Sequence, residues 1–227
     1  ITSQLSDNGA ALNITVDGGA TWILTNSANN YTGTTTIGAG ALGIGNDSAL
    51  GSGNVDLSNG SVFAYGADRT ITNPVRLLNN TGPGFIGDYS LTFTSTLQVL
   101  AGANNINTLF NNIAAGKSLT FGNVTADSIG ASRSWTFDGA GETIISGNFT
   151  TSTAFGVPII KTGDGILQLN GTASNFNQAS QNIDIDRGTF RLGASGVIPD
   201  GAGFGGVLLS PELANGDTAI FDLNGKT

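Results

Sequence analysis

The stretch YTGTTTIGAGALGIG, residues 31–45, carries the strongest indication of the fold. Its apolar and Thr positions alternate in short runs that end at glycines, which is typical of half-buried β-strands bounded by turns. It also contains a G-x-G-x-x-G string at Gly38, Gly40 and Gly43, a spacing that in nucleotide-binding proteins opens a helix. No helical periodicity follows the string. We therefore interpret these glycines as corner residues that tolerate a positive φ.

The same pattern recurs along the chain: short runs with alternating apolar positions are followed by Gly, Asn, Asp or Ser. Examples are VDL at 55–57, LTF at 91–93, ILQL at 166–169 and FRL at 190–192. Short, evenly spaced strands predict an all-β protein. The best helical pattern is residues 104–115, but its many Asn residues are poor helix formers, so we expect a short irregular excursion there.

Two segments far apart in the chain match each other. Residues 20–31 can be laid over residues 165–176, so that Trp22 meets Leu167, and after a three-residue insertion Gly40 meets Gly188. The match indicates a divergent repeat unit at about 17–65 and 162–221.

The connections distinguish two all-β architectures. A β-sandwich is the alternative, because Asn59-Gly60 and Asn215-Gly216 suit two-residue hairpin turns. Most linkers are longer, as expected when each strand pairs with the strand one coil later. We expect residues 1–227 to form a single right-handed parallel β-helix segment of roughly eight to eleven coils, a rod on the order of 45 Å long at ~4.8 Å per coil.

Composition excludes several classes of function. The net charge is −8, and the eight Lys and Arg residues are scattered, which argues against nucleic acid and anionic membrane surfaces as partners. Cys, His and Met are absent, so a zinc or iron–sulfur site, a Cys nucleophile and a Ser–His–Asp triad are excluded, and we expect no cofactor. No run is apolar and long enough to insert into a membrane, and no signal peptide is recognisable. We expect a processed product or a fragment of a longer polypeptide.

The best candidates for a site are the acids Asp184 and Asp186. On a strand they share one face, opposite the isoleucines that flank them, and Arg187 and Arg191 are close enough in sequence to neutralise them. A solvated polar face is the first interpretation, a calcium site is a weaker one, and a catalytic acid pair is the weakest.

Exposed aromatic side chains would offer a stacking platform for sugars. The candidates are Trp22, Tyr31, Tyr65, Tyr89 and Trp135. We expect both tryptophans in the core, Trp22 because it takes the position of a leucine in the second copy.

The order of motifs resembles a known repeat family. The run WIL at 22–24, followed by NNYTGTTTI at 29–37, GAL at 40–42 and ALG at 49–51, is similar to the autotransporter-associated β-strand repeat, also called the passenger-associated transport repeat. A second, weaker copy runs from Lys161 to Gly193, where an insertion replaces the Y-T-G-x-T core. The resemblance implies a right-handed parallel β-helix in a secreted protein of the bacterial cell surface, typically the stalk of an adhesin-like passenger.

These observations give one main hypothesis and two alternatives. The main hypothesis is a non-enzymatic structural or adhesive extracellular segment. Its expected partners are copies of itself, end to end or laterally, neighbouring repeats of the same polypeptide, or a glycan or other host-surface ligand. The alternatives are a carbohydrate-active β-helical enzyme and a non-catalytic glycan-binding module.

Overall fold

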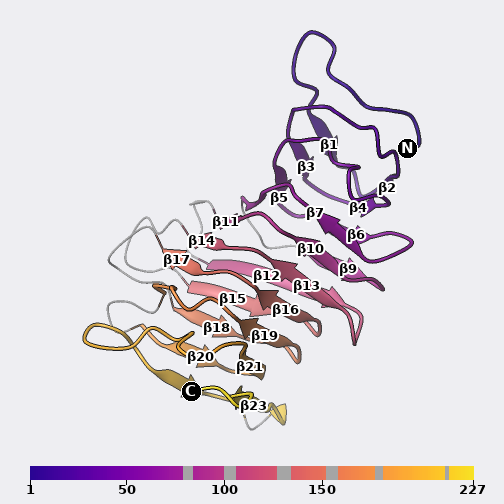
Figure 1. Ribbon diagram of the computed structural model, residues 1–227. Helices are drawn as coiled ribbons and strands as arrows, with labels where there is room; N and C mark the ends of the chain where they lie inside the picture. Colours follow the sequence, from indigo (N-terminus) through magenta and orange to yellow (C-terminus); the bar gives the residue numbers. More distant parts are fainter. Residues whose placement is uncertain (79–83, 100–105, 127–133, 152–157, 177–180, 213–214) are drawn as a thin grey trace.

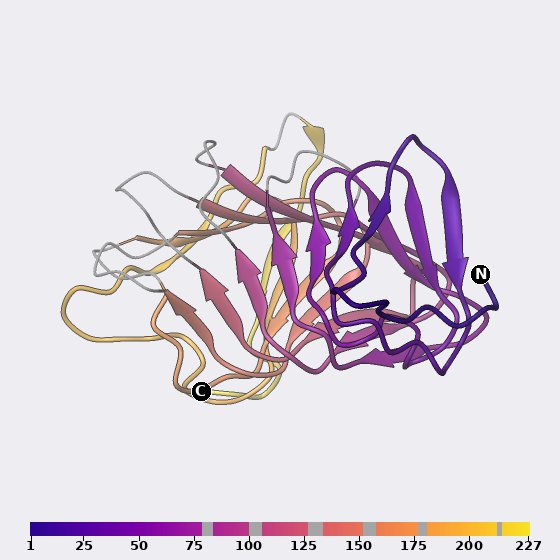
Figure 2. The same ribbon diagram turned by 90° about the horizontal axis from the view of Figure 1, so that it is seen from above.

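The computed structural model shows an all-β chain wound into a parallel β-helix (Figure 1). It describes residues 1–78, 84–99, 106–126, 134–151, 158–176, 181–212 and 215–227. Successive coils stack from the N-terminal to the C-terminal end, and Figure 2 shows the same stack from above. Every strand pair among the described residues is parallel, so the β-helix is confirmed and the β-sandwich is wrong.

Three sheets form the sides of the helix. Sheet 1 contains β1 (Ile14–Val16), β3 (Thr35–Ile37), β5 (Val55–Leu57), β8 (Val75–Leu77), β11 (Leu97–Val99), β14 (Val124–Ala126) and β17 (Phe149–Thr151). Sheet 2 contains β7 (Arg69–Ile71), β10 (Leu91–Phe93), β13 (Ser118–Phe121), β16 (Glu142–Ile145), β19 (Ile166–Leu169), β21 (Gly188–Leu192) and β23 (Ala219–Asp222). Sheet 3 contains β2 (Thr21–Leu24), β4 (Ala41–Ile44), β6 (Ser61–Ala64), β9 (Phe85–Gly87), β12 (Ile106–Ile113), β15 (Ser134–Asp138), β18 (Ile159–Lys161), β20 (Ile183–Ile185) and β22 (Val207–Leu209).

The length of a coil varies while the pairing stays in register. Thr35 pairs with Val55, one short coil later, whereas Gly188 pairs with Ala219 across a much longer excursion. The stack has about seven complete coils, fewer than the expected eight to eleven, because sheets 1 and 2 contain seven strands each and sheet 3 alone extends to nine strands. At ~4.8 Å per strand the strands of sheet 3 span ~38 Å.

The core is made of ladders of inward-facing side chains. Parallel pairing without slippage places the same inward position of successive coils directly above one another. Phe93 and Phe121 of sheet 2 are register partners in such a ladder, with ring centroids 5.6 Å apart and the rings stacked at 12°. Phe85 from sheet 3 packs edge-on against both rings, at 6.0 and 5.5 Å. Each ring removes a large apolar surface from water, so these ladders are the main source of stability.

The glycine string of residues 38–43 lies in a corner and in a strand. Gly40 has φ +82°, and a Cβ atom there would lie 2.3 Å from the carbonyl oxygen of Ala20 in the preceding coil. Gly43 lies inside β4. A strand rather than a helix follows the corner, so the interpretation as corner glycines is right for Gly38 and Gly40, of which only Gly40 has a positive φ, and wrong for Gly43.

The segment containing residues 106–113 differs from expectation. It forms β12, the longest strand, instead of an irregular excursion. Asn111 explains part of this result: its side chain is fully buried, its amide donates to Glu142 O at 2.9 Å and to Thr143 Oγ1 at 3.0 Å, and its Oδ1 accepts from Ile113 N–H. Contacts with the next coil therefore override the local helical pattern.

The two copies of the repeat lie on different sides of the helix. Trp22 belongs to β2 in sheet 3, whereas its counterpart Leu167 belongs to β19 in sheet 2. What the copies share is a strand, a corner glycine and a second strand, since Gly40 and Gly188 both have a positive φ.

Candidate functional site

The two candidate acids lie on the outer surface near the C-terminal end of the stack. Ile183 and Ile185 of β20 are buried in the core, and Asp184 between them faces outward. Asp186 follows directly after the strand. The predicted arrangement of two acids opposite the isoleucines is confirmed.

Asp184 and Asp186 interact with each other. Burial raises the pKa of Asp186, and the charge of Asp184, a hydrogen bond between the two carboxyl groups and the charge of Glu212 raise it further. Ser210 Oγ donates to Asp184 Oδ1 at 2.7 Å. Asp186 therefore retains its proton more readily than an isolated carboxyl group, which would allow it to act as a proton donor.

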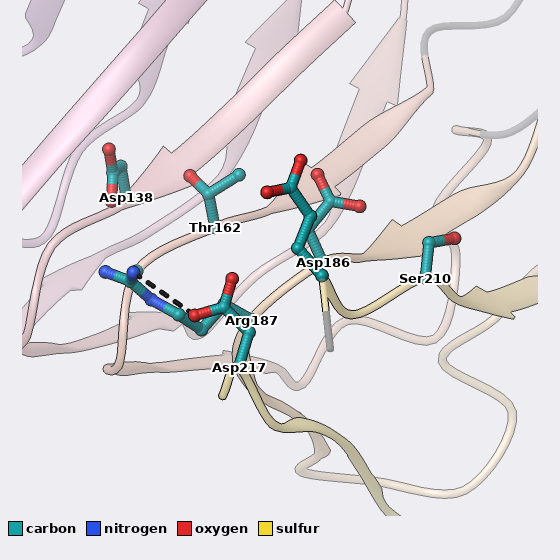
Figure 3. A pocket seen from close by; sticks show the side chains of 8 residues that line it. Asp138, Thr162, Asp186, Arg187, Ser210 and Asp217 are labelled. Carbon is teal, nitrogen blue, oxygen red and sulfur yellow. Dashed lines mark ion pairs between the residues drawn. The ribbon is translucent and has the colours of Figure 1, made fainter. Parts of the chain in front are cut away.

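Asp186 borders a hollow of about 360 Å³ at the corner between sheets 3 and 2 (Figure 3), whereas Asp184 is not part of its lining. Its lining consists of Asp138, Thr162, Gly163, Asp186, Arg187, Ser210, Glu212 and Asp217. The residues come from four successive coils: each ends or follows one of the sheet 3 strands β15, β18, β20 and β22, or precedes β23 of sheet 2. The hollow is polar, and four of its eight lining residues are acidic.

The arginines pair with other acids than expected. Arg187 forms ion pairs with Asp164 at 3.0 Å and Asp217 at 3.6 Å, and Figure 3 shows its guanidinium turned away from the carboxyl group of Asp186. Arg191 pairs with Asp222 at 2.9 Å, which is its register partner on the next strand, and with Glu142. The expectation that both arginines neutralise Asp184 and Asp186 is wrong, because the register of sheet 2 and the corner geometry direct them elsewhere.

A buried lysine lies beneath the hollow. Lys161 is 2% exposed and occupies an inward position between Phe137 and Ile185 of the neighbouring coils. Its Nζ donates to the backbone carbonyls of Thr162, Gly163 and Arg187. Burial lowers its pKa to about 8, which the carboxylates of Asp138 and Asp164 only partly offset. Sequence reasoning missed this residue, although alternation from buried Ile159 would have placed it inward.

Neither acid is shown to bind a metal. Within the ranges that the structure describes, no three His, Cys, Asp or Glu side chains are grouped so that they could hold a metal ion. A calcium role for Asp184 and Asp186 stays a prediction.

The aromatic candidates divide between the core and the surface. Trp135 is buried against Phe137 and Phe149, as predicted. Tyr31 is also buried, and its hydroxyl group forms a 2.7 Å hydrogen bond with Thr35 Oγ1.

Trp22 is not buried as expected. It is in register with the buried Leu42 and so faces inward, but it is 46% exposed because no described strand of sheet 3 lies beyond β2. Tyr65 and Tyr89 are exposed on the side of the helix.

The comparisons add no relative. No protein-family model matches the chain, and searches of curated proteins and of solved structures find no significant match. In the described part of the chain no helix is long and apolar enough to span a membrane.

Proposed function

We propose that the chain is a non-enzymatic structural and adhesive segment of an extracellular β-helix at the surface of a bacterium. The observation that carries the proposal is the unbroken parallel register of the three sheets, from Ile14 in β1 to Asp222 in β23. Such a stack holds its outer side chains at fixed spacings along a stable rod. The resemblance of residues 22–51 to the autotransporter-associated repeat supports the surface location.

The two ends of the stack support contacts with further coils. Trp22 at one end and Leu209 at the other both occupy inward positions, yet they are 46% and 51% exposed. Core ladders that end in uncovered apolar side chains favour stacking of another coil on them. Neighbouring repeats of the same polypeptide or a second copy would provide that coil.

Deletion of one coil tests the structural role. Removing residues 35–54 takes out one coil, because Thr35 is in register with Val55. The rod should shorten by ~4.8 Å and keep its β-sheet circular dichroism. The matched control removes residues 35–44, half of that coil, which misaligns every following ladder and should prevent folding.

Location and adhesion are tested in the cells that produce the protein. Antibody-gold labelling of intact cells should mark extracellular rods, and loss of the protein should reduce attachment to glycan-coated surfaces. Cells that carry the 35–54 deletion should still attach, whereas cells with the 35–44 deletion should not. Gold found only inside sectioned cells, or unchanged attachment without the protein, would refute the proposal.

A carbohydrate-active enzyme is the second candidate function. One observation favours it: Asp186, whose pKa is raised, lies beside Asp184 and borders an open acidic hollow, and glycosidases use pairs of carboxyl groups as proton donor and nucleophile or base. Release of reducing ends from polysaccharides that is lost in both Asp184→Asn and Asp186→Asn would support this function. Absence of turnover by the wild-type chain across neutral and acidic polysaccharides would dispose of it.

A further inference from the structure

A second hollow, of about 500 Å³, lies at the same kind of corner but near the N-terminal end of the stack. Its lining residues are Phe63, Ala64, Tyr65, Gly66, Ile86, Gly87, Asp88 and Tyr89. They belong to β6, to β9 and to the corners that follow these two strands. The volume lies within the range of small-molecule sites, about 300 to 1,000 Å³.

The register of strands β6 and β9 makes the floor of this hollow apolar. Val62 pairs with Phe85, and both are buried, so Phe63 and Ile86 stand side by side on the outer face of sheet 3. A Cβ atom at Gly43 would lie 2.7 Å from Phe63 Cζ, which shows that the Phe63 ring extends over this glycine of the preceding coil. The ring thus lies along the sheet and leaves the hollow open above it.

The two exposed tyrosines flank this floor. Tyr65 is 47% exposed and Tyr89 is 36% exposed, so a large part of each aromatic side chain is open to a ligand. They follow equivalent strands one coil apart. Gly66 and Gly87 both have a positive φ, so the chain turns beside the rings without adding side chains that would fill the space.

Polar groups accompany the rings. Asp88 also lines the hollow. Arg69 Nη2 donates to the carbonyl oxygen of Tyr65 at 2.8 Å, which holds this corner in place. A ligand in the hollow would therefore meet aromatic surface, phenol hydroxyl groups and a carboxylate acceptor.

We propose that this hollow binds a pyranose ring of a neutral glycan. The apolar C–H face of a pyranose suits stacking on Tyr65 or Tyr89, and its hydroxyl groups suit donation to Asp88. Acidic sugars fit less well, because Asp88 and the net charge of −8 would repel them. The inference rests on the proposed adhesive function and names the class of ligand that the segment would attach to.

Calorimetric titration of the whole chain with defined sugars tests this inference. The probes are the linear hexaoses of β-1,4-glucose, β-1,4-mannose and β-1,4-N-acetylglucosamine, with hexagalacturonate as the acidic comparison. At least one neutral hexaose should bind with a Kd of about 1 mM or tighter. The Kd of hexagalacturonate should be at least about tenfold higher.

The variants distinguish stacking from general surface effects. Tyr65→Ala and Tyr89→Ala should each weaken binding by roughly three- to tenfold, while Tyr65→Phe should retain most of it because the ring remains. Leu208→Ala is the matched control, since Leu208 is 46% exposed on the outer face of the same sheet but far along the stack. It should leave binding unchanged.

Two results would overturn the inference: no neutral hexaose binds at about 10 mM, or the two Tyr→Ala variants bind as well as the wild type. Circular dichroism of each variant shows that the β-helix is intact. If cells attach through the protein but the purified chain binds no neutral sugar, the adhesive function stands and this inference falls. If the chain binds sugar through the tyrosines but labelling finds it only inside cells, the proposed function falls instead.

Discussion

Lys161 allows the sharpest test of how a charge is held inside this β-helix. Its side chain lies in the ladder between Phe137 and Ile185 and is 2% exposed. Three backbone carbonyl groups accept from its Nζ, so the ammonium group has partners but little water. The consequence is a pKa lowered to about 8 from an ordinary value of 10.5.

The lowered pKa fixes the sign of a pH dependence. Because the unfolded chain binds this proton more tightly than the folded chain, protonation favours unfolding. The free energy of unfolding should therefore be lowest below pH 8 and rise as the pH increases toward 10.5. For this one group the full difference corresponds to about 3 kcal/mol, of which about 2 kcal/mol would be gained between about pH 7 and pH 9.5.

Urea denaturation followed by circular dichroism measures this gain. Lys161→Met keeps an unbranched side chain of similar length but cannot be protonated, so the rise attributable to residue 161 should disappear. NMR of the chain with isotope-labelled lysine provides a direct titration, in which the signal lost in Lys161→Met should have its midpoint near pH 8. An equal pH dependence in the wild type and the variant, or a midpoint near 10.5, would refute the reasoning.

Four further predictions follow from single contacts. Phe121→Ala should lower the free energy of unfolding by about 3 to 5 kcal/mol in urea denaturation, because the ring is fully buried in the phenylalanine cluster. Asn111→Ala should lower it by about 1 to 3 kcal/mol, since buried partners in the next coil lose their donor. Gly53→Ala should lower it by about 2 kcal/mol in the same assay, because the new Cβ would lie 1.9 Å from the carbonyl oxygen of the preceding coil. Asp184→Asn should lower the pKa of Asp186 in an NMR titration, because the neighbouring charge that raises it is removed.

Strand alternation predicted much of the fold because the inward and outward faces of a β-helix are chemically distinct. The run from Ile183 to Asp186 shows this plainly: isoleucines are inside and acids outside, as the sequence indicates. At Lys161 two rules conflict. Alternation from Ile159 places the side chain inside, whereas the charge of a lysine favours the outside. The decision depends on carbonyl groups at Thr162, Gly163 and Arg187, and the last of these comes from the next coil.

The position of a side chain was easier to predict than its exposure. Trp22 occupies a core position, as the match with a leucine indicated, but whether it is buried depends on what lies above β2. The partners of the ion pairs could not be predicted from the sequence either. Arg191 is close to Asp186 in sequence, yet register places it beside Asp222, and sequence distance carries no information about that register.

Both hollows lie outside the core ladders that determine the stability of the fold. Ladder residues such as Phe121 are fixed by the coils on either side, so a change there alters stability first. Tyr65 and Asp186 instead lie just after strands of sheet 3, at the corner toward sheet 2, where the side chains are not part of a core ladder. The two hollows are thus built from corner residues and outward-facing strand residues, whose types the core does not restrict. For this reason we expect Tyr65→Ala and Asp186→Asn to change what the surface binds or does while the β-helix remains folded.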